Sequence, residues 1–296
     1  MNIKNNIDEN TINKLFGSNS NIEAYLIELE KIKKNIGLNY KLISKGKNKG
    51  EKRLNMCSDE LKNKIISTWN YKLALKIIRD LFKSSNKYAN GKNAKKRFKV
   101  LIKEWTDLNL GEIKWPCSQG NFDEFVQRVN NSSELEKDKL VSKSAIKYRR
   151  MKELNTVRND FLETLIFEKN ENILPTLKHT RGTDYFIGGE SFDQKVSKSP
   201  TDEFKRKYEV DWRVKAITNP KIVAQFLYTY QDEGRFGADN RLLLVYLDEV
   251  ISSNKIEQAI NKINLKTPIK VKFSYQHAKL GKKNYEVKCF IIILSN

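Results

Sequence analysis

The sequence predicts a mixed α/β protein in which a helical, basic N-terminal part precedes a mixed sheet. Two observations predict this class. Apolar residues follow helical spacing through most of residues 21–170, and from residue 183 onward strand patterns alternate with helix patterns. With 296 residues, of which 39% are hydrophobic, the chain is long enough to bury a core. We expect two domains, covering residues 1–118 and 119–296.

The N-terminal half is expected to be helical. Helices are predicted over residues 21–37, 58–82, 93–108 and 121–130, with Ser58 as the N-cap of the second. Residues 111–120, which contain Trp115-Pro116, are predicted to form a loop. The longest periodic segment covers residues 142–170, and its expected buried stripe is Ile146, Met151, Leu154, Val157, Phe161 and Leu165.

The C-terminal part carries the strand patterns. Strands are predicted over residues 183–187, 190–197, 241–247, 269–276 and 285–294. Two helices are predicted between them, over residues 220–231 and 254–263, and Pro220 suits the first turn of its helix. We find no internal repeat in the sequence.

The charge of the chain indicates a polyanionic partner. The formal net charge is +20 and the pI about 9.6, which favours encounter with nucleic acid. The positive residues gather in three runs, at residues 40–53, 91–104 and 141–150. Any single run is equally explained as a solvated face. The three together favour a surface that follows phosphates.

Several classes of protein are excluded by the residues that are present. Cys57, Cys117 and Cys289 are far apart and form no zinc or disulfide pattern. His179 and His277 are too few and too distant for a histidine-based metal site. The polar N-terminus and the lack of a run of about 18–20 apolar residues predict a cytoplasmic protein with no membrane partner.

The most informative segment is a predicted hairpin around Gly188-Gly189. Two glycines accept the positive φ angles of a two-residue type I′ turn. Counting outward from that turn pairs Ile187 with Glu190 and places Asp184 opposite Asp193. Cross-strand Cβ atoms are about 4.5–5.5 Å apart, so the two carboxylates repel unless a cation lies between them.

Lys195 completes the predicted constellation. Side chains alternate along a strand, so Lys195 lies on the same face as Asp193. Two carboxylates for a divalent metal and one ammonium beside them suit hydrolysis of a phosphodiester. The competing interpretation is a surface hairpin with charged edges, since similar triplets occur at Glu60-Leu-Lys62 and at three other places. Only Asp193-Gln194-Lys195 follows another aspartate across a tight turn.

These residues resemble the motif of the PD-(D/E)XK nuclease superfamily, with Thr183-Asp184 and Asp193-Gln194-Lys195 in its two parts and Thr183 in place of the proline. The resemblance covers about half of the chain, residues 142–247. It implies a restriction-endonuclease-like αβββαβ core within residues 119–296, whose first strand would be residues 173–178 despite Pro175. It also implies Mg²⁺ held by Asp184 and Asp193, assistance from Lys195, and a supporting acid on the preceding helix. Glu163 fits that role best, and Asp160 and Glu168 are alternatives.

The activity that the resemblance implies is that of a type II restriction endonuclease, which cuts a short specific sequence in double-stranded DNA as a homodimer or a monomer. A repair or junction-resolving nuclease of the same fold and a non-enzymatic basic DNA-binding protein are the alternatives. The segment after the second motif strand is expected to be a loop in the DNA groove. The expected DNA-contacting residues are Lys198, Ser199, Lys205, Arg206, Lys207, Arg213, Arg235, Arg149 and Arg150.

Overall fold

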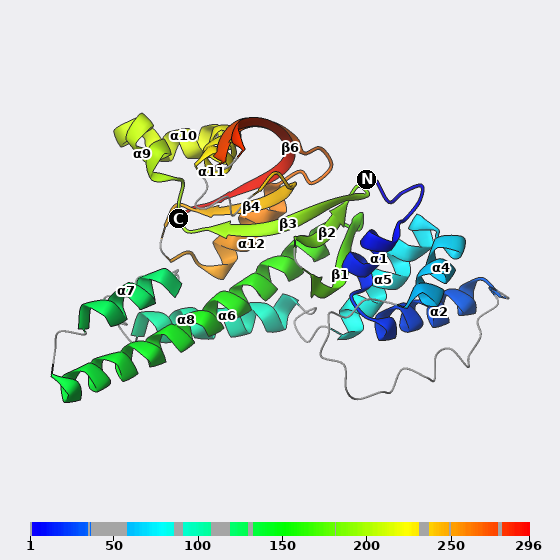
Figure 1. The fold of residues 1–296 in the computed structure, drawn as a ribbon, viewed down its shortest axis with the longest axis horizontal. Helices are drawn as coiled ribbons and strands as arrows, with labels where there is room; N and C mark the ends of the chain where they lie inside the picture. The colour runs from blue at the N-terminus through cyan, green and yellow to red at the C-terminus, as the bar shows by residue number, and fades with distance from the viewer. Residues whose placement is uncertain are drawn as a thin grey trace.

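The protein is built on one six-stranded mixed sheet, in the order β1-β2-β3-β4-β6-β5 (Figure 1). The computed structural model describes residues 2–34, 36, 58–85, 91–107, 119–129, 133–180, 182–230, 237–248, 250–277 and 280–296. The strands are β1 (Ile173–Thr180), β2 (Thr183–Ile187), β3 (Glu190–Ser197), β4 (Arg241–Tyr246), β5 (Ile269–His277) and β6 (Gly281–Leu294). β1, β2 and β3 are antiparallel neighbours, β4 and β6 run parallel to β3, and β5 is an antiparallel edge. The predicted mixed α/β class is confirmed.

Helices surround this sheet and dominate the N-terminal half. They are α1 (Glu9–Phe16), α2 (Asn19–Ile32), α4 (Asp59–Thr68), α5 (Tyr71–Ser85), α6 (Gly91–Asp107), α7 (Gln119–Val129), α8 (Glu134–Lys169), α9 (Asp202–Tyr208), α10 (Trp212–Thr218), α11 (Pro220–Thr229) and α12 (Ser253–Lys262), with a short 3-10 helix η1 (Glu209–Asp211). From α8 onward the order is α8, three strands, the α9–α11 group, β4, α12 and the β5–β6 pair.

Three apolar cores hold these layers together. The largest joins α6, α8 and α12 to one face of the sheet, around Phe161 and Leu244. A second lies on the opposite face between α9–α11 and the sheet, around Tyr228 and Leu243. The third joins α1, α2, α4 and α5 to β1 and β2. In Figure 1 this N-terminal group gathers at β1, at the other end of the sheet from α9 and α10.

The N-terminal helices are tied to the body of the protein. The Arg79 guanidinium on α5 donates to the carbonyls of Phe167, Asn170 and Ile173, at the corner between α8 and β1. On α6, Phe98 stacks on Phe161 of α8 with ring centroids 5.0 Å apart. Side chains from residues before position 118 therefore belong to the same cores as the sheet. The predicted division at residue 118 stays a prediction.

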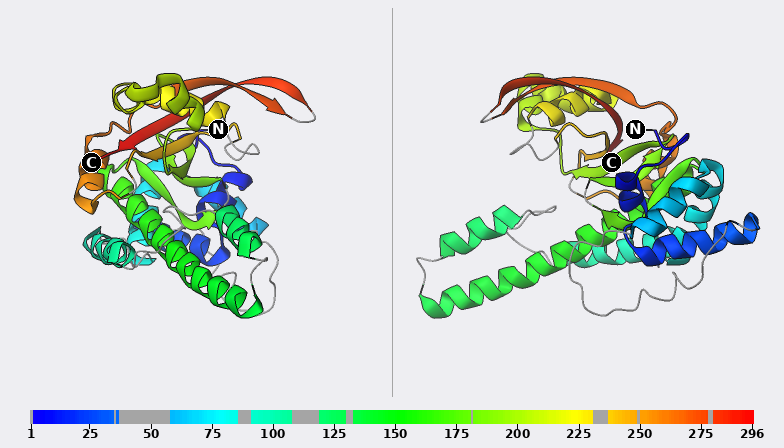
Figure 2. Two further views of the ribbon diagram at one scale, coloured as in Figure 1. Left: turned by 90° about the vertical axis from the view of Figure 1, so that its left-hand side faces the viewer. Right: turned by 45° about the vertical axis from the view of Figure 1, so that its right-hand side comes forward.

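Helix α8 is longer than predicted, since it begins at Glu134 and not near residue 142. The predicted stripe is buried from Met151 onward, but Ile146 is 60% exposed and its predicted burial is wrong. The reason is visible in Figures 1 and 2, where the N-terminal half of α8 and helix α7 project away from the sheet. That half has no sheet to pack against and therefore needs no apolar stripe.

Two predicted segments are divided differently in the structure. The single helix expected over residues 58–82 is two helices, α4 and α5, because the Trp69 indole donates to the Ile3 carbonyl and Asn70 caps the second helix through the Leu73 amide. Ser58 precedes α4 without a side-chain capping bond. The loop expected after β3 folds as α9, η1 and α10, and Thr201 caps α9 through the Phe204 amide.

Smaller differences lie at element ends and outside the described residues. Helix α1 was not predicted, and β6 begins at Gly281, before the predicted residue 285. The basic run at residues 40–53 lies outside the described residues, as do residues 111–118 of the predicted loop, while residues 119 and 120 already belong to α7. β1 forms as the family resemblance implied, with Pro175 opposite Tyr185.

The turn between β2 and β3 has the predicted glycine geometry. Gly188 and Gly189 have φ angles of +63° and +90°, which are strained for any residue with a Cβ atom. A Cβ on Gly189 would also lie 2.1 Å from Asn2 Oδ1, whereas a Cβ on Gly188 would meet nothing within 4 Å. The N-terminal segment is held there by the Ile3 amide, which donates to the Gly189 carbonyl at 2.8 Å.

We therefore expect Gly189→Ala to lower the free energy of unfolding by about 2–3 kcal/mol and Gly188→Ala by only about 1 kcal/mol. The difference comes from displacing the side chains of Asn2 and Lys4. Urea unfolding of the two variants beside the wild type measures it. Equal losses would contradict the close approach of the N-terminal segment to Gly189.

Candidate active site

The hairpin register agrees with the sequence prediction up to the last ladder pair. Ile187 pairs with Glu190, Phe186 with Ser191 and Tyr185 with Phe192. The ladder ends there, so the predicted pairing of Asp184 directly opposite Asp193 is wrong. Asp184 Oδ2 instead accepts from the Gln194 amide at 2.5 Å. On its other edge β3 pairs with β4, beginning with Asp193 opposite Arg241.

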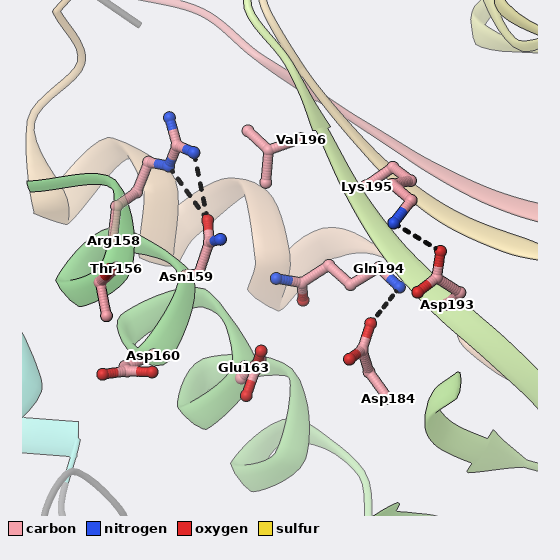
Figure 3. Close-up of a pocket in the computed structure, with 10 residues that line it drawn as sticks. All are labelled: Thr156, Arg158, Asn159, Asp160, Glu163, Asp184, Asp193, Gln194, Lys195 and Val196. Carbon is pink, nitrogen blue, oxygen red and sulfur yellow. Dashed lines mark hydrogen bonds and ion pairs between the residues drawn. The ribbon is translucent and has the colours of Figure 1, made fainter. Parts of the chain in front are cut away.

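One cavity of about 430 Å³ opens where β2 and β3 separate, beneath α8 (Figure 3). All four side chains predicted to be catalytic lie on its wall: Glu163 from α8, Asp184 from β2, and Asp193 and Lys195 from β3. In the view of Figure 3, the Asp184 carboxylate lies between those of Glu163 and Asp193. The other lining residues are Thr156, Arg158, Asn159, Asp160, Gln194 and Val196. The structure thus brings the predicted set together, although not through the predicted pairing.

The acid on α8 is electrostatically linked to Asp184, one of the two motif aspartates. Burial raises the pKa of Glu163 to about 8, and the negative charges of Asp184 and Asp160 add to the rise. Of the two alternatives, Asp160 also lines the cavity, whereas Glu168 is exposed and does not. Without a cation, the protein keeps a proton on Glu163 at neutral pH because a further negative charge there is unfavourable.

Asp193 is held between two positive side chains. Its side chain is only 6% exposed, and Oδ2 is 2.8 Å from Lys195 Nζ. The contact confirms that Asp193 and Lys195 share a face of β3. The second partner is the Arg241 guanidinium, which contacts the same oxygen. Lys195 is 42% exposed along its side chain, so its ammonium can meet both Asp193 and a molecule that enters from solvent.

Three further residues of the site were not predicted. Gln194, the middle residue of the triplet, accepts a 2.9 Å hydrogen bond from the Tyr185 hydroxyl through Oε1. Arg158, 5% exposed on α8, donates to Asn159 Oδ1 and lies 5.9 Å from the Tyr246 ring. Arg241 opens β4. The sequence shows that Arg241 begins a predicted buried strand, but it does not show that Asp193 is the residue opposite it in the sheet.

The donor set suits a hard divalent cation. Among the residues that the structure describes, no three His, Cys, Asp or Glu side chains stand close enough together to form a ready-made metal site. Mg²⁺ does not require one, since it commonly binds through one or two carboxylates and keeps water and substrate phosphate as its other ligands. Asp184 and Asp193 offer carboxylate oxygens on the wall of the same cavity. Burial is the main cause of the raised pKa of Glu163, and a cation would relieve the smaller contribution that comes from the charge of Asp184.

The eight residues predicted to contact DNA that the structure describes do not line the cavity. Arg213 donates to the Leu247 carbonyl and to Asp248 Oδ2, and Arg206 and Arg150 form ion pairs within their own helices, with Glu203 and Glu153. Lys205 lies over the Trp212 ring and Lys207 over the Tyr208 ring. Ser199 donates to the Pro200 carbonyl, and Lys198 and Arg149 are exposed. Arg235 lies outside the described residues, and contacts of all nine with DNA stay a prediction.

Comparisons with known proteins do not assign a family. No family model matches the chain, and searches of curated proteins and of solved structures found no significant match. No helix in the described part of the chain has both the length and the apolar content needed to cross a membrane.

Proposed function

We propose that the protein is a Mg²⁺-dependent endonuclease that hydrolyses phosphodiester bonds in double-stranded DNA. The supporting observation is that Glu163, Asp184, Asp193 and Lys195, from three separate elements, line one cavity. Three carboxylates and one ammonium suit the metal-assisted hydrolysis of a phosphodiester. The net charge of +20 supports a polyanionic substrate.

Each side chain has a role that follows from its position. Asp184 and Asp193 would hold Mg²⁺, which supplies positive charge to the scissile phosphate and lowers the pKa of a water molecule. Lys195 reaches the cavity from the same face as Asp193 and donates a hydrogen bond to the attacking water or to a phosphate oxygen. Glu163 would support the site from α8, where the negative charge of Asp184 contributes to the rise in its pKa.

The finer proposal is a type II restriction endonuclease. It rests on the resemblance of the two motif parts and on the basic side chains of α9, α10 and α8 that lie outside the cavity. Such a protein reads base edges with Arg and Lys and positions itself by phosphate contacts. A homodimer would match the two-fold symmetry of a palindromic site.

The deciding experiment is incubation of the purified protein with phage DNA in the presence of Mg²⁺ or of a chelator. We expect discrete fragments with Mg²⁺ and intact DNA with the chelator. Cleavage confined to branched or damaged DNA would favour a repair nuclease and contradict the restriction assignment. Absence of cleavage under any divalent cation, on DNA that the protein does bind, would contradict the nuclease proposal.

A non-enzymatic DNA-binding protein is the second candidate, and one observation favours it. Asp193 is already paired with Lys195 and Arg241, so its charge is compensated without any metal. Under this candidate the cavity has only a structural role. The same incubation separates the two functions, because a binding protein would retain DNA in a salt-dependent manner with or without Mg²⁺.

A further inference from the structure

Arg241 occupies an unusual position for a positive side chain. It is the first residue of β4 and stands opposite Asp193 in the parallel β3–β4 register. Its side chain is 5% exposed and that of Asp193 is 6% exposed, so both charged groups are largely shielded from solvent. Two opposite charges buried together are stable only as a pair, since each alone would be strongly unfavourable.

Two further acids, Asp184 and Asp239, act on the guanidinium. The negative charge of Asp184 acts on Arg241 and offsets part of the effect of burial on the pKa of its guanidinium. A third acid, Asp239, lies 3.3 Å from Arg241 Nη2, but its side chain is 67% exposed. Arg241 therefore pairs directly with Asp193, one of the two carboxylates that the proposed function assigns to Mg²⁺.

We infer that Arg241 is a built-in counter-ion of the metal site, which neutralises Asp193 in the cation-free protein and competes with a divalent cation for it. This inference rests on the proposed function. An arginine keeps its charge at all relevant pH values, so it cannot leave by losing a proton. A cation must instead displace the guanidinium from Asp193, and binding is weakened by the energy of the contact that is lost. The site would therefore fill best when substrate phosphate is present to receive the released guanidinium.

Arg241→Gln tests the competition, with Ca²⁺ titrated by calorimetry in the absence of DNA. Ca²⁺ is the probe because it takes oxygen ligands and needs no substrate phosphate. Glutamine keeps hydrogen-bond donors near Asp193 and removes the positive charge. We expect Ca²⁺ to bind the variant at least about tenfold more tightly than the wild type. We also expect Ca²⁺ to raise the melting temperature of the variant more than that of the wild type.

Lys62→Gln is the matched control. Lys62 is another buried cation, 2% exposed, and it pairs with Glu9 and Asp59 among the N-terminal helices. Its replacement removes a buried positive charge away from the cavity, so Ca²⁺ affinity should not change. Equal Ca²⁺ affinity in wild type and Arg241→Gln would overturn the counter-ion role and leave the proposed function standing. Failure of both proteins to bind Ca²⁺ would overturn the metal-dependent function and the competition together.

A second measurement does not depend on the stability of Arg241→Gln. In wild-type protein with ¹⁵N-labelled arginine, the Nε–Hε signal of Arg241 is assigned by its disappearance in Arg241→Lys. We expect this signal to shift and to exchange faster with solvent when Ca²⁺ is added, because the guanidinium leaves Asp193. A signal that stays unchanged at saturating Ca²⁺ would show that cation and arginine do not compete.

Discussion

Replacing Asp193 by asparagine is expected to lower the rate of DNA cleavage by about a thousandfold, while DNA binding stays within about threefold of wild type. The substitution removes one of two charges that the proposed function assigns to Mg²⁺, and it leaves the shape of the side chain unchanged. Alanine would be a poor choice here. It would leave the buried Arg241 with neither a negative charge nor an acceptor oxygen beside it, at a cost of about 3–5 kcal/mol, and loss of activity would then report unfolding, whereas asparagine keeps an oxygen that accepts from the guanidinium.

The measurement is a time course of plasmid cleavage, with a gel-retention assay of the same preparations. Glu190→Gln is the control on the same strand, since Glu190 also gives a carboxylate to an ion pair, with Lys288, but does not line the cavity. Its cleavage rate should stay near that of wild type. Lys195→Met should lower the rate by about a hundredfold without changing DNA retention. Normal cleavage by Asp193→Asn would rule out the proposed mechanism.

The part of the site that depends on local sequence could be predicted. Two adjacent glycines determine a hairpin turn, and the turn determines the register of the residues next to it. Strand alternation then places Asp193 and Lys195 on one face, as their 2.8 Å contact confirms. The same local rule does not extend to Asp184, because the β2–β3 ladder ends at Tyr185 and Phe192 and the Asp184 carboxylate accepts from the Gln194 amide instead.

What depends on non-local packing could not be predicted. Arg241 is 48 positions away from Asp193 along the chain, and only the strand order brings them together. Periodicity identified the buried half of α8 but overestimated burial at Ile146, because the pattern cannot show where the sheet ends. Among the three acids proposed on α8, Glu168 could be set aside only after α8 had been placed over the cavity.

Glu163→Gln is expected to make the cation-free protein more stable than wild type at pH 9 by an amount on the order of 3 kcal/mol, and about equally stable at pH 5. Burial and the charges of Asp184 and Asp160 raise the pKa of Glu163 to about 8 in the folded state, above its ordinary value of 4.5. The folded protein then holds a proton that the unfolded chain has lost. The stabilisation that protonated Glu163 contributes is present in full below about pH 4.5, its ordinary pKa, and is lost as the pH rises through 8. Glutamine, which stays neutral, does not show this loss.

Urea unfolding of both proteins at several pH values measures the difference, with Glu168→Gln as the control because Glu168 lies exposed on the same helix. The Glu168 variant should follow the wild type at every pH. A constant offset between Glu163→Gln and wild type from pH 5 to 9 would mean that Glu163 is not buried beside Asp184. Repeating the series with Mg²⁺ tests whether cation binding changes the titration of Glu163. If the cation binds where Asp184 and Asp193 offer oxygens, it also reduces the repulsion that Glu163 experiences, and the advantage of glutamine at pH 9 should shrink.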